Sequence, residues 1–165
     1  MKSTVINDKS VKNVIGLDQE YTSRLNDRLN ILLSNYQIFY MNVRGFHWNI
    51  RGEKFFELHA KFEELYDDLQ LKIDELAERV LTLGGEPLHT FSDYLSRSEV
   101  EVAKSMSNGK AAVAALVHSF SILIRLQREL LALSAEADDE GTNSLMSDYI
   151  REQEKLVWMY RSFLG

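Results

Sequence analysis

The spacing of apolar residues along the chain predicts long helices. The first carries apolar side chains every three or four residues over positions 25–43, which places them along one helical face. Asp18 is its expected N-cap, and the helix ends at Gly45 or continues to Trp48. A second apolar stripe covers residues 55–83, and a Gly-Gly pair predicts a firm end behind it.

Two further helices are expected in the second half of the chain. The third follows Asn108 and carries its apolar face over residues 113–130. The polar segment AEADDEGTNS, residues 135–144, separates it from the fourth. The fourth helix is expected to begin near Thr142 and to bury Leu145, Tyr149, Leu156, Met159 and Phe163.

The connection between the second and third helices is unusually long. More than 20 residues separate Gly84 from Asn108, so the chain is expected to cross the molecule there, with a short helix near residues 92–95. Two short connections and one crossing connection predict an all-α fold: a ferritin-like four-helix bundle with a long crossover that carries a short extra helix. We expect this bundle at residues 17–165, behind a flexible polar tail at residues 1–16.

The composition agrees with a helical protein and narrows its chemistry. The 165 residues include 8 Gly, 1 Pro and no Cys, which argues against turn-rich β folds and excludes disulfide scaffolds and thiolate sites. The longest purely apolar run, residues 111–117, is far shorter than the ~20 residues of a membrane span. The N-terminal segment MKSTVINDKSVKNV has no signal-peptide core, so a cytoplasmic location is expected.

Histidines and acids in and before the second helix are the candidate chemistry. His47 and His59 flank the breaker NIRG, and the second helix also carries Glu63, Asp74 and Glu78. His59 and Glu63 are one helical turn apart, as are Asp74 and Glu78, so each pair shares a face. Imidazole and carboxylate ligands without cysteine suit ferrous iron. Charged residues four positions apart also form ordinary solvated faces, so the spacing alone leaves a structural role open.

Distance along the helix restricts any such site. His59 and Asp74 are 15 residues apart, which is about 22 Å along a helix axis, whereas ligand–metal distances are roughly 2 Å. A site that uses both histidines and both distant acids must therefore be shared between two chains, as an antiparallel two-fold pairing allows. The alternative is a di-iron site inside one bundle, which uses Glu-x-x-His on two helices. The only such motif, at residues 86–89, lies behind the helix end, which disfavours that alternative.

A specific motif spans residues 36–85: HWN, a histidine twelve residues after the first, D-x-x-x-E, and R-x-x-x-L-G-G. This segment resembles the signature of the Dps mini-ferritins (DNA-binding proteins from starved cells). The resemblance extends from about Leu17 to Leu164 and includes the ending DYIREQEKLVWMYRSFL.

The resemblance implies roles for individual residues. The family's ferroxidase histidines correspond to His47 and His59, and the metal-binding acids of the neighbouring subunit correspond to Asp74 and Glu78. These four residues are implied to be catalytic. Glu63 is implied as a fifth metal ligand, at the position that assists the second, weaker iron, where the family usually has Asp.

The resemblance also implies an activity. Such proteins are ferroxidases that form a homododecameric shell with 23 symmetry. Fe(II) is oxidised to Fe(III) at two iron positions per intersubunit site, preferably by hydrogen peroxide rather than oxygen. The ferric mineral is stored inside the shell, which protects the cell from oxidative stress. Trp48 matches a family position near the site, where it either supplies an electron when a second iron is absent or packs in the interface.

Acids crowd the expected start of the fourth helix. In one interpretation they are a polar turn that favours the next helix N-terminus. In the other, three copies around a symmetry axis form a negative pore that attracts Fe²⁺, as the matching region does in the family. The candidate residues are Glu136, Asp138, Asp139, Glu140 and Asp148.

DNA binding is expected to be weak. Residues 1–17 contain three lysines against one aspartate, a side-chain charge of +2, whereas a shell of twelve chains at −6 each carries about −72. Twelve tails could still bind through avidity, with the complex lost at physiological salt, and nucleoid association would follow from it. The alternative function is a DNA-compacting structural protein with a secondary metal-binding role.

Overall fold

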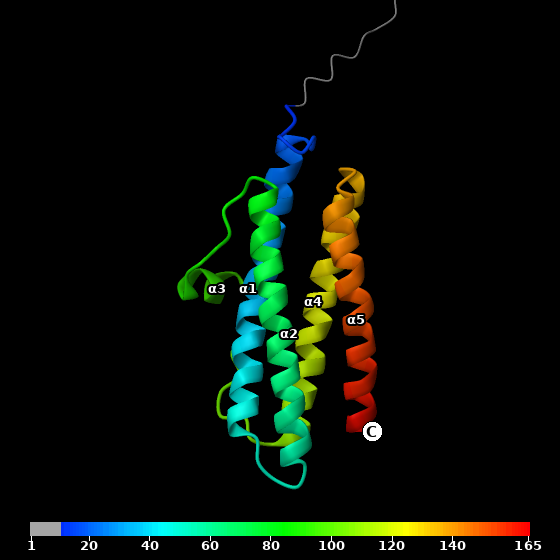
Figure 1. Cartoon of the computed structure of the whole chain (residues 1–165). Helices are drawn as coiled ribbons and strands as arrows, with labels where there is room; N and C mark the ends of the chain where they lie inside the picture. Colours follow the sequence, from blue (N-terminus) through cyan, green and yellow to red (C-terminus); the bar gives the residue numbers. More distant parts are fainter. Residues whose placement is uncertain (1–10) are drawn as a thin grey trace, which may run out of the picture.

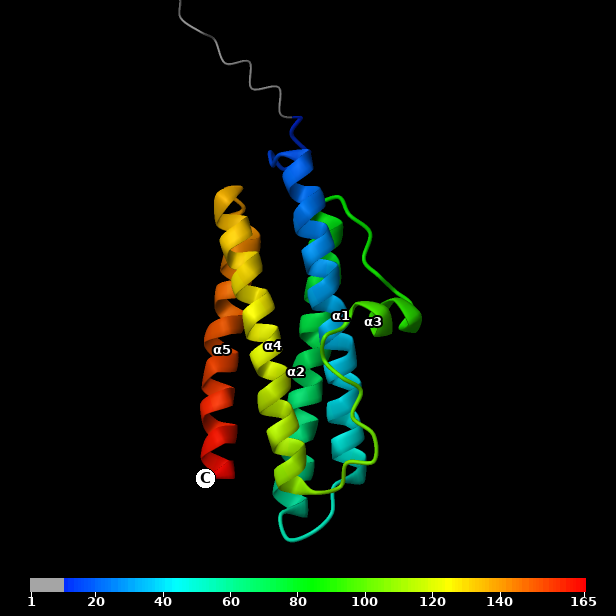
Figure 2. The same ribbon diagram turned by 180° about the vertical axis from the view of Figure 1, so that it is seen from behind.

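Two antiparallel helix pairs form the body of the molecule (Figure 1, Figure 2). The computed structural model describes residues 11–165, and within them it contains α1 (Gln19–Asn49), α2 (Phe55–Thr82), α3 (Phe91–Arg97), α4 (Gly109–Glu136) and α5 (Glu140–Leu164). After α2 the chain runs back along the length of the bundle, and α3 forms part of this connection beside α1 (Figure 2). The predicted ferritin-like bundle with a helix-bearing crossover is therefore confirmed.

The helices α1 and α4 begin where a side chain satisfies one of their first free amides. Asp18 accepts a hydrogen bond from the Tyr21 amide at 2.9 Å, and Asn108 accepts one from the Ala111 amide at 3.0 Å. α1 continues past Gly45 to Asn49, because the apolar stripe continues through the buried side chain of Phe46.

The N-terminal segment leads into α1 through a turn. The Asn13 Oδ1 atom accepts hydrogen bonds from the amides of Ile15 (3.2 Å) and Leu17 (2.9 Å). Lys12 forms an isolated antiparallel bridge with Asp18. Residues 1–10 of the predicted tail lie outside the described part of the chain.

The turn between α4 and α5 is shorter than the polar segment predicted. Most of residues 135–144 are helical, and only residues 137–139 separate the two helices. Asp138 adopts a positive φ of 55°, and Asp139 caps α5 by accepting from the Thr142 amide at 3.0 Å. Polar residues favour helix ends as well as loops, which is why this boundary was misplaced.

The buried face of α5 also differs from the prediction. Its buried residues are Thr142, Met146, Tyr149 and Gln153. Met159 and Phe163, expected in the core, are 46% and 39% exposed. Two of the buried positions are polar, so the apolar pattern alone did not indicate the inward face of the helix.

Three asparagines of α1 hold the crossover against the bundle. Asn30 accepts from the Leu88 amide at 2.8 Å, and Asn42 accepts from the Ala103 amide at 2.9 Å. Asn35, which is fully buried, accepts from the amides of both Glu99 and Val100 at 2.9 Å. The crossover therefore obtains hydrogen-bond partners from the helix beneath it, although it has little regular structure of its own.

Within the described residues, α4 alone has the length and apolar composition that could span a membrane. In the bundle 44% of the qualifying segment is buried, against the other helices. The core helix of a helical bundle passes the same test, so this is weak support for a membrane span. Polar residues interrupt this segment, so it contains no uninterrupted apolar run of that length.

Candidate metal centre

The two predicted histidines form a stacked pair. His47 lies in the last turn of α1 and His59 in the second turn of α2. Their ring centroids are 3.7 Å apart and the ring planes differ by 18°. His47 is buried and His59 is half-buried, so the pair sits at the edge of the bundle.

Each ring is oriented by a main-chain carbonyl of the other residue. The His47 Nδ1 atom lies 2.7 Å from the His59 carbonyl oxygen, and the His59 Nδ1 atom lies 2.9 Å from the His47 carbonyl oxygen. A carbonyl oxygen only accepts hydrogen bonds, so each Nδ1 carries the proton. In the neutral form of each ring, the lone pair is therefore on Nε2 and available to a metal ion, the arrangement in which histidine ligands are typically oriented.

Aromatic side chains enclose the pair. The Phe55 ring stacks on His59 with centroids 5.0 Å apart, and the Tyr66 ring meets His47 edge-on at 5.3 Å. Trp48 is 59% exposed beside the site, with the Arg44 guanidinium 4.7 Å from its ring centre. The aromatic contacts restrict rotation of both imidazoles, whereas Trp48 leaves most of its surface open.

The acids predicted for this site are exposed along α2. Glu63 lies one turn beyond His59, and its Oε1 atom is 3.4 Å from the Tyr66 hydroxyl, a long contact. Asp74 and Glu78 are exposed further along the helix. Neither takes part in the ion pairs found within the described residues.

The fold of one chain does not bring the two groups together. Within residues 11–165, no cluster of three or more His, Asp or Glu side chains could hold a metal ion. His59 and Asp74 belong to the same continuous helix, and their 15-residue separation corresponds to about 22 Å. Within one chain the histidine pair is therefore separated from both Asp74 and Glu78.

Side-chain amides meet in the centre of the bundle around Tyr36. A metal site inside the bundle would need carboxylates and histidines there instead. The Tyr36 hydroxyl accepts hydrogen bonds from the side-chain amides of Gln127 and Gln153, at 2.8 and 2.5 Å. His89, from the Glu-x-x-His sequence, is exposed in the crossover. Neither arrangement favours the intrabundle alternative.

The acids of the α4–α5 turn are not equivalent. Asp139 is 3% exposed, and its carboxylate pairs with Arg79 of α2 at 2.5 Å. It therefore forms an ion pair within the chain and does not line a pore. Glu136 accepts from the Tyr21 hydroxyl at 2.9 Å, and Asp148 pairs with Arg151 at 2.8 Å. The exposed carboxylates are Glu136, Asp138, Glu140 and Asp148.

Comparison with known proteins identifies the family. A ferritin-like domain model matches residues 26–165. The DNA protection during starvation protein of Porphyromonas gingivalis is 40% identical over 155 residues, 94% of this chain and 98% of the relative. The chain belongs to the Dps family of ferritin-like proteins. The resemblance inferred from the HWN and D-x-x-x-E motifs is confirmed.

Two other proteins match over nearly the whole chain. The crystal structure of the DPS protein from Vibrio cholerae O1 is 57% identical, with a TM-score of 0.92 over 93% of this chain and 97% of that chain. It is described as a member of a broad superfamily of ferritin-like diiron-carboxylate proteins. An uncharacterized protein of Haemophilus influenzae is 50% identical over 151 residues, 92% of this chain and 94% of the relative. The individual metal ligands remain predictions from motif and geometry.

Proposed function

We propose that this Dps-family protein stores iron and protects the cell from oxidative damage as a ferroxidase. Its active site is shared between two subunits of a dodecameric shell in the cytoplasm. The observation that carries the proposal is the pair formed by His47 and His59. Main-chain carbonyls occupy both Nδ1 atoms and leave both Nε2 atoms for a metal ion, while the acids that could complete a metal site lie far along the same helix.

The exposed face of α2 is suited to a two-fold pairing. At 100° per residue, one stripe of the helix contains Phe56, His59, Glu63, Asp67, Leu71, Asp74, Glu78 and Leu81. His59 precedes Asp67 by eight residues and Asp74 follows it by seven. An antiparallel pairing centred near Asp67 therefore brings His59 of one subunit beside Asp74 of the other.

Large apolar side chains are exposed on the same face. Phe56 is 81% exposed, Leu71 67% and Leu81 58%, and Trp48 of α1 is 59% exposed. Apolar groups of this size gathered along one helix face are typical of protein interfaces. A two-fold interface would cover them and would exclude water around the completed metal site.

The proposed chemistry uses iron as the substrate. Imidazole nitrogen from one subunit and carboxylate oxygen from the other, including Glu63 at the second position, suit Fe(II). Two Fe(II) ions each lose one electron, and hydrogen peroxide with two protons takes up both electrons to give two water molecules. A single Fe(II) ion supplies only one electron, which leaves a hydroxyl radical. A site that binds two Fe(II) ions together would therefore be protective. Oxygen would serve as the slower oxidant.

Subunit mixing tests whether the site is shared. His47→Ala/His59→Ala and Asp74→Ala/Glu78→Ala chains should each be inactive alone in ferric absorbance after addition of Fe(II) and peroxide. In a mixed two-fold dimer, one of the two sites receives intact histidines and intact acids. Random coassembly of equal amounts should therefore restore about a quarter of the wild-type sites.

Two results would contradict the proposal. Sites held within one chain would give no recovery on mixing. A wild-type protein that shows no fast ferric absorbance, or whose mass in solution is that of a monomer or simple dimer, would leave no ferroxidase shell to explain. The alternative would then be a DNA-compacting protein, a role with which the name of the Porphyromonas gingivalis relative is consistent.

A further inference from the structure

A lysine ammonium lies between two acids where α2 packs against α5. Lys72 of α2 is 5% exposed. Its Nζ atom is 2.5 Å from Asp68 Oδ1 and 2.9 Å from Glu152 Oε2 of α5. The same atom lies 5.2 Å from the centre of the Tyr149 ring. A buried ammonium is unfavourable unless it is fully paired, and here two carboxylates and an aromatic face surround it.

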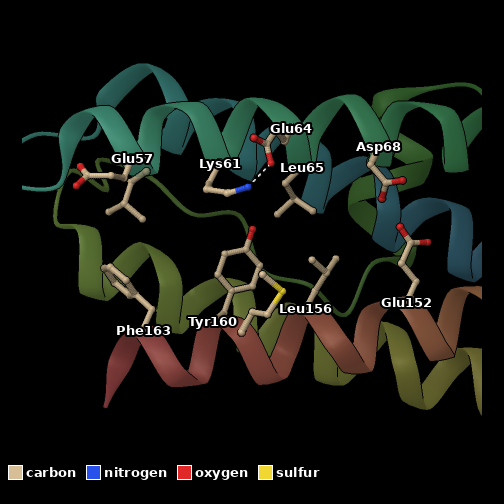
Figure 3. A pocket seen from close by; sticks show the side chains of 11 residues that line it. Glu57, Lys61, Glu64, Leu65, Asp68, Glu152, Leu156, Tyr160 and Phe163 are labelled. Carbon is tan, nitrogen blue, oxygen red and sulfur yellow. Dashed lines mark hydrogen bonds and ion pairs between the residues drawn. The ribbon is translucent and has the colours of Figure 1, made fainter.

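These acids line a groove between α2 and α5 (Figure 3). Its volume is about 370 Å³. Asp68 and Glu152 approach each other from opposite walls, while Leu156 and Phe163 belong to the apolar lining (Figure 3). Asp68 and Glu152 remain 32% and 49% exposed at the side chain, so solutes in the groove can reach them.

The spacing of the two carboxylates suits a cation other than the ammonium. Both oxygens contact the same Nζ atom, at 2.5 and 2.9 Å, so they are at most 5.4 Å apart. Modest side-chain rotation would bring them onto one divalent ion, with water completing its oxygen ligands. The positive charge already supplied by Lys72 opposes this, because the ion would bind beside a fixed like charge in a partly buried site.

We propose that Lys72 is a built-in counter-cation that prevents divalent metal from binding between Asp68 and Glu152. In this role it is a specificity-determining residue, because removal of its charge converts the acid pair into an additional metal site. Only the consequence for iron, which would otherwise be diverted from the histidine pair, rests on the proposed function. The additional site itself does not.

Metal counting in charge variants tests the proposal. Lys72→Met keeps an unbranched apolar stem of similar length but removes the ammonium. We expect it to bind one more Co(II) ion per chain than the wild-type protein, measured by equilibrium dialysis and by the visible absorbance of the ion. Lys72→Arg, which keeps the charge, should bind the wild-type number. Lys72→Met/Glu152→Gln should lose the extra ion.

Two further arms make the result decisive. Lys72→Gln removes the charge but retains a hydrogen-bond donor for the carboxylates, so it provides a folded neutral variant if Lys72→Met does not fold. Repeating the count with Asp74→Ala/Glu78→Ala in the same chain should leave the extra ion in place, which separates this site from the histidine-linked one. A folded neutral variant that binds no additional Co(II) would show that Lys72 only ties α2 to α5, and would overturn the proposal.

Discussion

Asn35→Ala should destabilise the protein far more than its mid-helix position suggests. The Asn35 Oδ1 atom accepts from the amides of Glu99 and Val100 at 2.9 Å, and the side chain is fully buried. The substitution leaves both crossover amides without this partner. A lost hydrogen bond costs about 1 kcal/mol and a buried unsatisfied donor about 1–3 kcal/mol. The expected loss in free energy of unfolding is therefore about 2–4 kcal/mol.

The measurement is urea unfolding at fixed protein concentration, with hydrogen exchange of the Val100 amide as a local readout. Asn49→Ala is the matched control. Asn35 and Asn49 lie in the same helix and donate to the carbonyl four residues earlier, each at 2.8 Å, but Asn49 is exposed. The control should change stability by less than about 0.5 kcal/mol. An Asn35→Ala variant as stable as this control would refute the role assigned to the asparagine contacts.

Two other predictions concern packing and pH. Alanine at Gly85 would place its Cβ 2.5 Å from Asn26 Cγ, so Gly85→Ala should cost about 1–3 kcal/mol in urea unfolding. Gly45→Ala, in α1 with no atom within 4 Å of its new Cβ, should instead gain about 0.5–1 kcal/mol; equal effects would contradict this reading. Burial, with a smaller effect of Glu64, raises the pKa of Tyr160 to about 12. The folded state holds the Tyr160 proton more tightly than the unfolded state, so the stabilisation from this proton is complete below pH ~10. It is lost as the pH rises from ~10 through the folded-state pKa of about 12. Between pH 10 and 12, the free energy of unfolding should fall less with rising pH in Tyr160→Phe than in the wild type. Parallel plots of this free energy against pH would exclude a contribution from Tyr160.

The sequence predicts the positions of the helices better than the contacts between them. The apolar stripe of α2 and the N-cap Asp18 follow local rules, so the structure reproduces them. The α5 face was misjudged because Thr142 and Gln153 are polar yet buried. Burial of such residues depends on partners contributed by other helices, which no periodicity within one segment indicates.

The candidate site shows the same division. Residue spacing along one helix was enough to separate His59 from Asp74, because helix geometry fixes that distance. The three asparagines of α1 were missed, since a polar residue within a helix ordinarily indicates a solvated face. The role of Asp139 was also not readable, because its partner Arg79 is 60 residues away in the sequence.

The reciprocal contacts between His47 and His59 divide the support of each imidazole into two parts. The hydrogen-bond acceptor of each ring is a peptide oxygen, so replacing either side chain removes the stacked ring but leaves the acceptor of the surviving ring in place. A chain with a single histidine should therefore keep the Nδ1 hydrogen bond that orients the remaining ring and lose only the stacking contact.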